Sequence, residues 1–241
     1  MKLVLDPHTH SIASVHAYST IGENARYAAD IGLELLGITD HAPAMPGVNT
    51  GRYFFNLRAV PDRLFGVEIM CGAEFNILNF EGEMDIPLDH QETYDIGIAS
   101  LHRPCIAPGN IEENTAALVN AMKNPHVNII GHPGEPKYPI DIREVVSSAI
   151  RTKCALEINE ASLIPGGFRA GGEENIANIL RLCKAEKYPV VLGSDAHFFT
   201  HIGNFENCLR LLEELEFPEE LVLNTRVSFF KEFLENKKNQ G

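Results

Sequence analysis

The chain has 241 residues, of which 44% are hydrophobic and 22% charged, and these ordinary values fit a globular protein with a substantial core. Its 20 Lys and Arg residues against 33 Asp and Glu residues give a formal net charge of −13, which argues against a nucleic-acid surface or an anionic membrane partner. The five cysteines are widely spaced and form no C-x-x-C pair, so the reducing cytoplasm is the expected compartment. No apolar run approaches the ~20 residues needed to cross a bilayer. We expect one domain over residues 1–241, with neither nucleic acid nor membrane as a partner.

Short apolar runs of strand length alternate with helical patterns along the chain. The seven runs are LVLD (3–6), LELLGIT (33–39), FGVEIMCGA (65–73), YDIGIAS (94–100), HVNIIG (126–131), CALEIN (154–159) and YPVVLGS (188–194). Helical patterns begin at the capping box of Thr20 and Glu23, near Asn114, at Asp141, near Glu173, near Leu209 and after Pro218. This alternation predicts parallel βαβ units, and seven strands favour a closed or nearly closed α/β barrel, with an open doubly wound sheet as the alternative. The long connections 42–64 and 75–93 are typical of functional loops.

Residues able to bind metal follow almost every apolar run. In chain order the candidates are His8, His10, His16, His41, Glu74, His102, His132, Asp195 and His197. In a parallel barrel all strand carboxyl ends lie on one face, so we expect these side chains to converge there. Imidazole and carboxylate suit zinc, manganese or iron, and one tetrahedral site uses about four ligands. Nine ligands therefore predict two or three ions.

Four stretches carry a family resemblance that spans essentially the whole chain. They are HTHSIASVHAYST (8–20), ITDHAP (38–43), GHPGEPKY (131–138) and LGSDAH (192–197). Together with the strand-ending glutamate they resemble the polymerase-and-histidinol-phosphatase (PHP) superfamily, and more narrowly its YcdX-type stand-alone phosphatases. The resemblance implies a distorted (β/α)7, TIM-like barrel with a trinuclear metal centre, usually zinc, at the strand carboxyl ends. Carried over by position, the three ions would take His8, His10, Glu74 and Asp195; Glu74, His102 and His132; and His16, His41 and His197.

The expected activity is metal-dependent hydrolysis of a small phosphomonoester, which makes a small phosphorylated metabolite the expected partner. Two ions bridged by Glu74 would lower the pKa of a water and produce the attacking hydroxide, and we expect Glu74, Asp195 and His197 to be catalytic. Three Zn²⁺ ions are the expected cofactors, with Mn²⁺ or Fe²⁺ as alternatives. Arg58 and Arg103 are the expected contacts to substrate phosphate, since the guanidinium fork suits phosphate oxygens, although both could equally be solvated loop charges.

Other functions are weighed against this one. A phosphodiesterase or nuclease of the PHP type is the main alternative, but the acidic charge balance and the lack of a basic, aromatic-lined groove argue against it. A non-enzymatic metal-binding protein is less well supported, because structural zinc sites are typically closed and rich in thiolates. An amidohydrolase would usually require a bridging lysine, and no lysine follows a predicted strand. The physiological substrate, and whether the protein is a monomer or a homo-oligomer, stay open.

Overall fold

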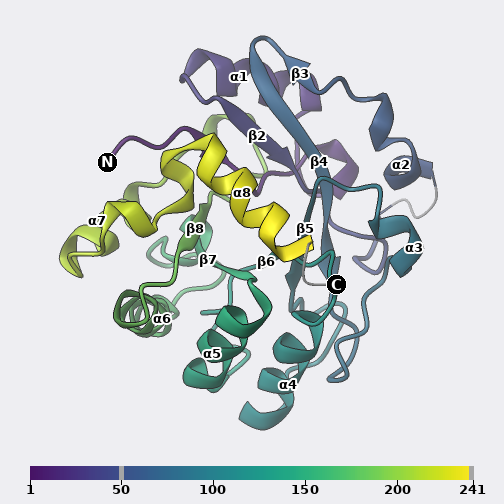
Figure 1. Cartoon of the computed structure of the whole chain (residues 1–241). Coiled ribbons are helices and arrows are strands. Elements are labelled where there is room, and N and C mark those ends of the chain that lie inside the picture. Colours follow the sequence, from purple (N-terminus) through teal and green to yellow (C-terminus); the bar gives the residue numbers. More distant parts are fainter. Residues whose placement is uncertain (49–51, 239–241) are drawn as a thin grey trace.

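Seven parallel strands curve around a central axis, with helices on the outside (Figure 1). The computed structural model describes residues 1–48 and 52–238. The strands follow one another in the order β1 (Leu5–Asp6), β2 (Leu35–Ile38), β4 (Val67–Asn76), β5 (Ile96–Ser100), β6 (Ile129–Ile130), β7 (Ala155–Asn159) and β8 (Val190–Gly193). Each lies on one of the predicted apolar runs, and β4 continues three residues beyond its run. A short strand that the sequence pattern does not indicate, β3 (Arg63–Leu64), pairs antiparallel with β4.

The first and last strands are joined where the metal-ligand candidates lie. Thr9, just after β1, forms a parallel bridge with Ala196, just after β8. His10 N–H donates to the carbonyl of Ala196 at 2.9 Å, and Asp195 N–H donates to the carbonyl of His8 at 3.0 Å. These bonds bring the two edges of the sheet together at the carboxyl end, which confirms the distorted barrel over the open sheet.

A single buried amide joins the same two strands nearer their amino ends. The side chain of Asn224 accepts from Leu192 N–H at 2.7 Å and donates to the carbonyls of Leu192 and Leu5 at 2.8 and 3.1 Å. Asn224 is fully buried, so it substitutes for ladder bonds that β1 and β8 would otherwise exchange.

Helices cover the outside of the strands. They are α1 (Ile21–Asp30), α4 (Ile111–Ala121), α5 (Ile142–Thr152), α6 (Glu173–Ala185), α7 (Glu206–Glu214) and α8 (Val227–Lys238), with short turns of helix at α2 (Arg52–Phe55) and α3 (Leu88–Gln91). Thr20 and Glu23 form the predicted capping box of α1. The α4 helix begins before the predicted start near Asn114, because Asn110 and Glu113 form a second capping box. Among residues 1–48 and 52–238, no helix has the length and apolar character needed to span a membrane.

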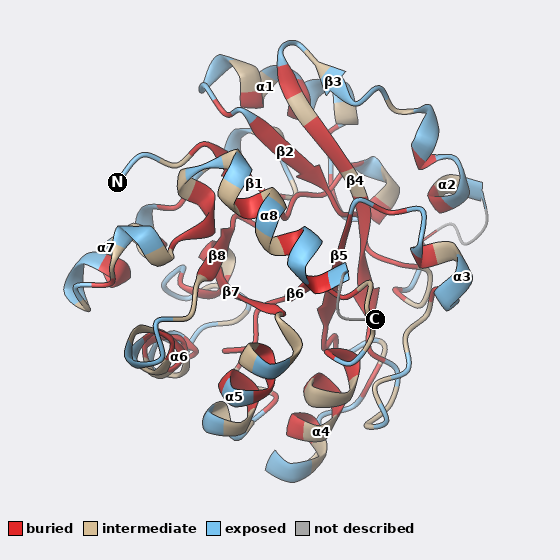
Figure 2. Cartoon of the chain, viewed as in Figure 1, coloured by how far each residue is buried: buried red, intermediate tan, exposed pale blue. Residues whose placement is uncertain are grey.

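The last helix starts later than predicted and closes the amino end of the barrel. Residues 219–221 and 223–225 form 3₁₀ turns after Pro218, and α8 begins at Val227. Phe230 and Leu234 of α8 are buried against Leu5, Leu35 and neighbouring side chains of the barrel interior. Figure 1 shows α8 crossing this end of the barrel, and Figure 2 shows its buried residues alternating with exposed ones.

The long connections hold short structured pieces. The predicted loop 42–64 contains α2, a 3₁₀ turn at Leu57–Ala59 and β3, while its residues 49–51 lie outside the described part of the chain. In the predicted loop 75–93, residues 75–76 belong to β4, Ile77 bridges Met84, and α3 follows.

Candidate metal centre

Glu74 lies at the centre of a buried histidine cluster at the carboxyl end of the barrel. It lies in β4, two residues before the strand ends, and is fully buried. Five imidazole nitrogens lie within 4 Å of its carboxylate oxygens: His8 Nε2 at 3.5 Å, His10 Nε2 at 3.7 Å, His41 Nδ1 at 2.6 Å, His102 Nε2 at 3.2 Å and His132 Nε2 at 3.1 Å. These residues follow β1, β2, β5 and β6, so the parallel topology is what brings them together.

The remaining candidates adjoin this group on its β8 side. Asp195 Oδ1 lies 3.1 Å from His10 Nε2 and 3.8 Å from His8 Nε2. His197 Nε2 lies 2.9 Å from His16 Nε2, and the ring of His197 is 4.3 Å from that of His10, centroid to centroid. All nine predicted ligand side chains therefore lie in one cluster.

Several donor atoms in the cluster lack the well-aligned hydrogen bonds that a buried polar atom requires. His41 Nδ1, Glu74 Oε2 and His102 Nε2 are buried and form no well-aligned hydrogen bond in the described part of the chain, although His41 Nδ1 lies close to Glu74 Oε2 and His102 Nε2 lies 3.2 Å from Glu74 Oε1. Such atoms are costly to bury unless something else binds them. Three triads hold their ligand atoms within 4.8 Å of one another: His8, His10 and Glu74; His41, Glu74 and His102; and His10, His41 and His197. The donor set fits divalent metal ions.

The protonation states that the cluster favours also suit metal binding. Burial would raise the pKa of Glu74, but His102, His41 and His8 hold that pKa well below its ordinary value. Burial lowers the pKa of His102 to about 4, despite the nearby Glu74 carboxylate. Burial, together with His197 and His41, lowers the pKa of His10 well below its ordinary value. The ionised Glu74 carboxylate and neutral His10 and His102 present free electron pairs, which is the form in which these groups bind metals. Glu157, Glu74 and Asp195 instead raise the pKa of His8 well above its ordinary value, although burial acts in the opposite direction, so a metal ion at His8 would displace a proton.

Glu157, within β7, contacts two histidines of the cluster, and the pattern of polar residues that follow strands does not indicate it. Its side chain is buried, with Oε1 hydrogen-bonded to His8 Nδ1 at 2.6 Å and Oε2 accepting from His132 N–H at 2.7 Å. Gly193 of β8 makes room for it, because a Cβ there would lie 1.9 Å from Glu157 Oε1. A carboxylate on the far nitrogen of a metal-binding histidine fixes the ring and raises its basicity.

Other polar side chains orient further members of the cluster. Asn76 Oδ1 lies 2.7 Å from His102 Nδ1, and the Asp85 carboxylate accepts from Asn76 at 2.7 and 2.9 Å. Asp40 accepts from the Ser14 hydroxyl at 2.6 Å, and that hydroxyl lies 3.0 Å from His10 Nδ1. The influence of Asp40 on the imidazole of His10 therefore passes through Ser14.

Arg169 is a second functional candidate that sequence reasoning missed. It lies in the irregular segment between β7 and α6, and its Nη1 is 2.6 Å from Asp195 Oδ2 while its Nε is 3.5 Å from Glu135 Oε2. Arg169 holds the pKa of Asp195 well below its ordinary value, although burial acts in the opposite direction. The guanidinium thus lies directly beside the cluster, where it could contact an anionic ligand.

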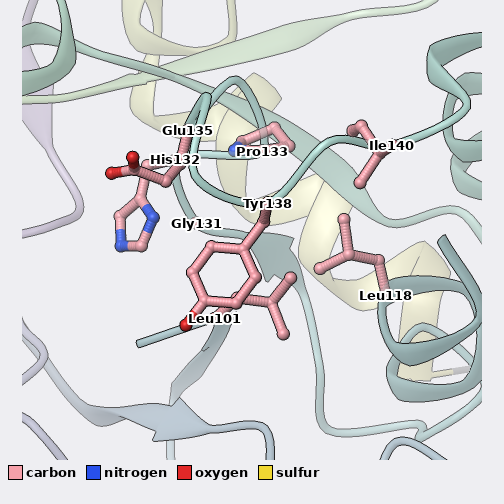
Figure 3. A pocket seen from close by; sticks show the side chains of 8 residues that line it. All are labelled: Leu101, Leu118, Gly131, His132, Pro133, Glu135, Tyr138 and Ile140. Atoms are coloured by element: carbon pink, nitrogen blue, oxygen red, sulfur yellow. The ribbon is translucent and has the colours of Figure 1, made fainter. Parts of the chain in front are cut away.

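A cavity of about 600 Å³ opens over the cluster. Its lining residues include His16, His41, His102, Asp195 and His197 from the cluster, and Arg103, Glu135, Lys137, Phe168 and Arg169 around them. The structure thus places Arg103 at this cavity, whereas Arg58 lines a different cavity beside α2 and α3. A much smaller space of about 10 Å³ is lined by residues of the 131–140 segment with Leu101 and Leu118, and Figure 3 shows His132 and Glu135 on one side of it and Leu118 and Ile140 on the other.

Comparisons with known proteins identify a family by sequence and similar folds among solved structures. The family model of the PHP domain matches residues 6–161. A probable phosphatase of Thermoanaerobacter sp. is 48% identical over 241 residues, covering 100% of this chain and 98% of the relative, and a probable phosphatase of Clostridium novyi is 45% identical over 237 residues, covering 98% and 96%. Among solved structures, a histidinol phosphate phosphatase of Lactococcus lactis, complexed with zinc, L-histidinol and phosphate, has a TM-score of 0.62 at 19% identity and covers 89% of this chain and 94% of that one.

Proposed function

Because the chain belongs to the PHP domain family, we propose that it hydrolyses small phosphomonoesters at the cluster centred on Glu74. Family membership confirms the resemblance found in the sequence and the expected class of enzyme, a phosphatase. The substrate, the number of ions and the role of each residue belong to the proposal. We further propose that residues 1–241 act as one domain.

The observation that carries the proposal is the set of buried nitrogen and oxygen atoms around Glu74 that form no well-aligned hydrogen bond and could bind metal. We propose three Zn²⁺ ions, with Mn²⁺ or Fe²⁺ as alternatives, held by the nine ligands in the three groups that the family resemblance implies. The zinc, L-histidinol and phosphate bound in the Lactococcus lactis protein of similar fold support this choice of cofactor and substrate class. When bound, the ions would supply Lewis acidity and lower the pKa of a coordinated water.

The protein side chains would then position the substrate and keep the donors in their reactive states. Glu74 would be shared between ions, because imidazoles approach both of its carboxylate oxygens. Arg169 would keep Asp195 ionised and offer its remaining donors to phosphate oxygens, since a guanidinium carries five N–H groups. His197 lies where the cluster meets the cavity, with 27% of its side chain exposed, so it would face the phosphate rather than the interior. Arg103 stays a proposed substrate contact, and the position of Arg58 gives that residue no support.

Metal analysis combined with a phosphatase assay tests the proposal. Purified protein should contain more than one equivalent of transition metal per chain and hydrolyse p-nitrophenyl phosphate. The His10→Ala variant should lose metal and activity while keeping the circular dichroism spectrum of a folded barrel. Less than one equivalent of metal after loading, or unchanged turnover by the variant, would contradict the proposal.

A further inference from the structure

The cavity over the cluster is larger than phosphate alone requires. A volume of about 600 Å³ lies in the range of ~300–1,000 Å³ typical of sites for small organic ligands. Its lining combines residues of the cluster with Arg103, Lys137 and Phe168. The cavity therefore has room for the leaving group of a phosphoester bound at the cluster, with these three residues in its lining.

Lys137 and Phe168 form one unit in this lining. Lys137 Nζ lies 3.8 Å from the centroid of the Phe168 ring and donates to the Phe168 carbonyl at 2.8 Å. These contacts fix the ammonium group at the edge of the cavity. An ammonium has three donors, so Lys137 keeps donors for a ligand. Phe168 itself is 81% exposed, which leaves apolar surface for the body of a ligand.

The charges around this part of the cavity are positive on balance. Arg169 lies between Asp195, at 2.6 Å, and Glu135, at 3.5 Å, and the two carboxylates share its single positive charge. Lys137 Nζ forms an ion pair with Glu135 Oε1 at 3.8 Å, so Lys137 and Arg169 together balance the two carboxylates. Arg103 takes part in no ion pair within residues 1–48 and 52–238 and faces the cavity with its charge uncompensated.

We infer that this part of the lining selects phosphomonoesters whose leaving group carries its own anionic group, a carboxylate or a second phosphate, which Lys137 and Arg103 bind while Phe168 packs against its apolar part. A leaving group with an ammonium would meet the unpaired charge of Arg103 beside Lys137, and bringing like charges together is unfavourable. The inference rests on the proposed function and makes it more specific by naming the substrate class.

Three aryl phosphates of similar size test the inference: 4-(carboxymethyl)phenyl, 4-methylphenyl and 4-(2-aminoethyl)phenyl phosphate. Their phenols are closely matched in acidity, so differences in kcat/KM report mainly on the charge of the distal group. For the metal-loaded wild type we expect kcat/KM on the anionic substrate to exceed that on the cationic one by about tenfold, the ratio given by ~1.4 kcal/mol. Lys137→Met and Arg103→Met should each lower this ratio, and the double variant should bring it close to one. Lys123→Met, at an exposed lysine two residues after the end of α4, is the matched control and should keep the wild-type ratio.

The outcomes separate this inference from the proposed function. Turnover of all three substrates without preference, or a preference that survives in the double variant, would overturn the inference and leave the phosphatase proposal intact. Failure to hydrolyse any of the three with metal bound would overturn both. Arg103→Met keeps the test valid if Lys137→Met does not fold, because the Arg103 side chain is exposed.

Discussion

The two ends of the barrel are built from opposite kinds of side chain. At the amino end, Phe230 and Leu234 of α8 fill the opening against Leu5 and Leu35. At the carboxyl end, buried imidazoles and carboxylates surround Glu74, and several of their atoms form no well-aligned hydrogen bond. The first arrangement stabilises the fold through burial of apolar surface, and the second places costly polar groups where a ligand can satisfy them. The amino end of the barrel therefore contributes mainly to stability and the carboxyl end to chemistry. Substitutions at the amino end should change stability, and those at the carboxyl end should change activity.

The largest effect is expected from Glu74→Gln. A neutral amide in place of the shared carboxylate removes a negative charge that faces five imidazoles, and we expect loss of at least ~4 kcal/mol of transition-state stabilisation, on the order of 10³-fold in kcat/KM. Activity on p-nitrophenyl phosphate and metal content should both fall. Glu160→Gln is the control, since Glu160 is a buried carboxylate that accepts from Asn207 N–H and Cys208 N–H at the start of α7. Glu160→Gln should keep wild-type metal content and activity. If Glu74→Gln kept them as well, Glu74 would not have the role proposed for it.

At the opposite end, Phe230→Ala should reduce stability and leave the chemistry alone. Removing a fully buried ring leaves a cavity between α8 and the barrel interior, which costs about 3–5 kcal/mol in the free energy of unfolding. Urea titration measures this loss, and kcat of the folded fraction should match the wild type. The half-buried Phe229 is the matched control, for which Phe229→Ala should cost less. An equal drop in kcat for Phe230→Ala would show that the two ends are coupled.

Asn224→Ala tests how the two edge strands are joined. The substitution leaves Leu192 N–H and two carbonyls without partners, and an unpaired buried polar group costs about 1–3 kcal/mol. We expect the unfolding free energy to fall by ~2–3 kcal/mol and the Leu192 amide to exchange faster with solvent. Asn236→Ala, at an exposed position of α8, should change neither quantity.

The smallest effect is expected from Glu157→Gln, which sharpens the comparison because Glu157 lies between the two ends. The amide oxygen of the glutamine can still accept a hydrogen bond from His8. The amide NH2 group would then face His132 N–H, so that two donors would meet. Loss of such a supporting carboxylate costs about 10–100-fold in metal affinity or activity. Competition with a chelator measures metal affinity directly, and an affinity equal to that of the wild type would show that Glu157 serves only the fold.

The sequence predicts the strands, and the gathering of the candidate side chains at one end of them, for one physical reason. Each strand is a short apolar run that stops where polar residues begin, and parallel topology puts all those stops on one face. His8, His102 and Asp195 could thus be grouped without knowing any distance. The pattern of polar residues that follow strands does not indicate Glu157, because Glu157 lies inside the run CALEIN. A charged residue within a buried strand nevertheless requires a partner, and this requirement is itself a signal.

Residues on irregular loops could not be placed in this way. Arg58 and Arg103 look equivalent in the sequence, and only the path of the chain puts one at the main cavity and the other beside α2. Arg169 follows two glycines in a segment without periodicity, so no pattern indicates which way its side chain points. The room that Gly193 leaves for Glu157 depends on the register of β7 and β8, which the sequence alone does not reveal.

The bridge between Thr9 and Ala196 has a consequence for how the protein matures. During translation, His8 and His10 leave the ribosome first, and Asp195 and His197 emerge almost two hundred residues later. No nascent chain can present the full ligand set before its final strand has docked against its first. The proposed metal centre can therefore assemble only late in biosynthesis, and chains terminated before this point would lack it.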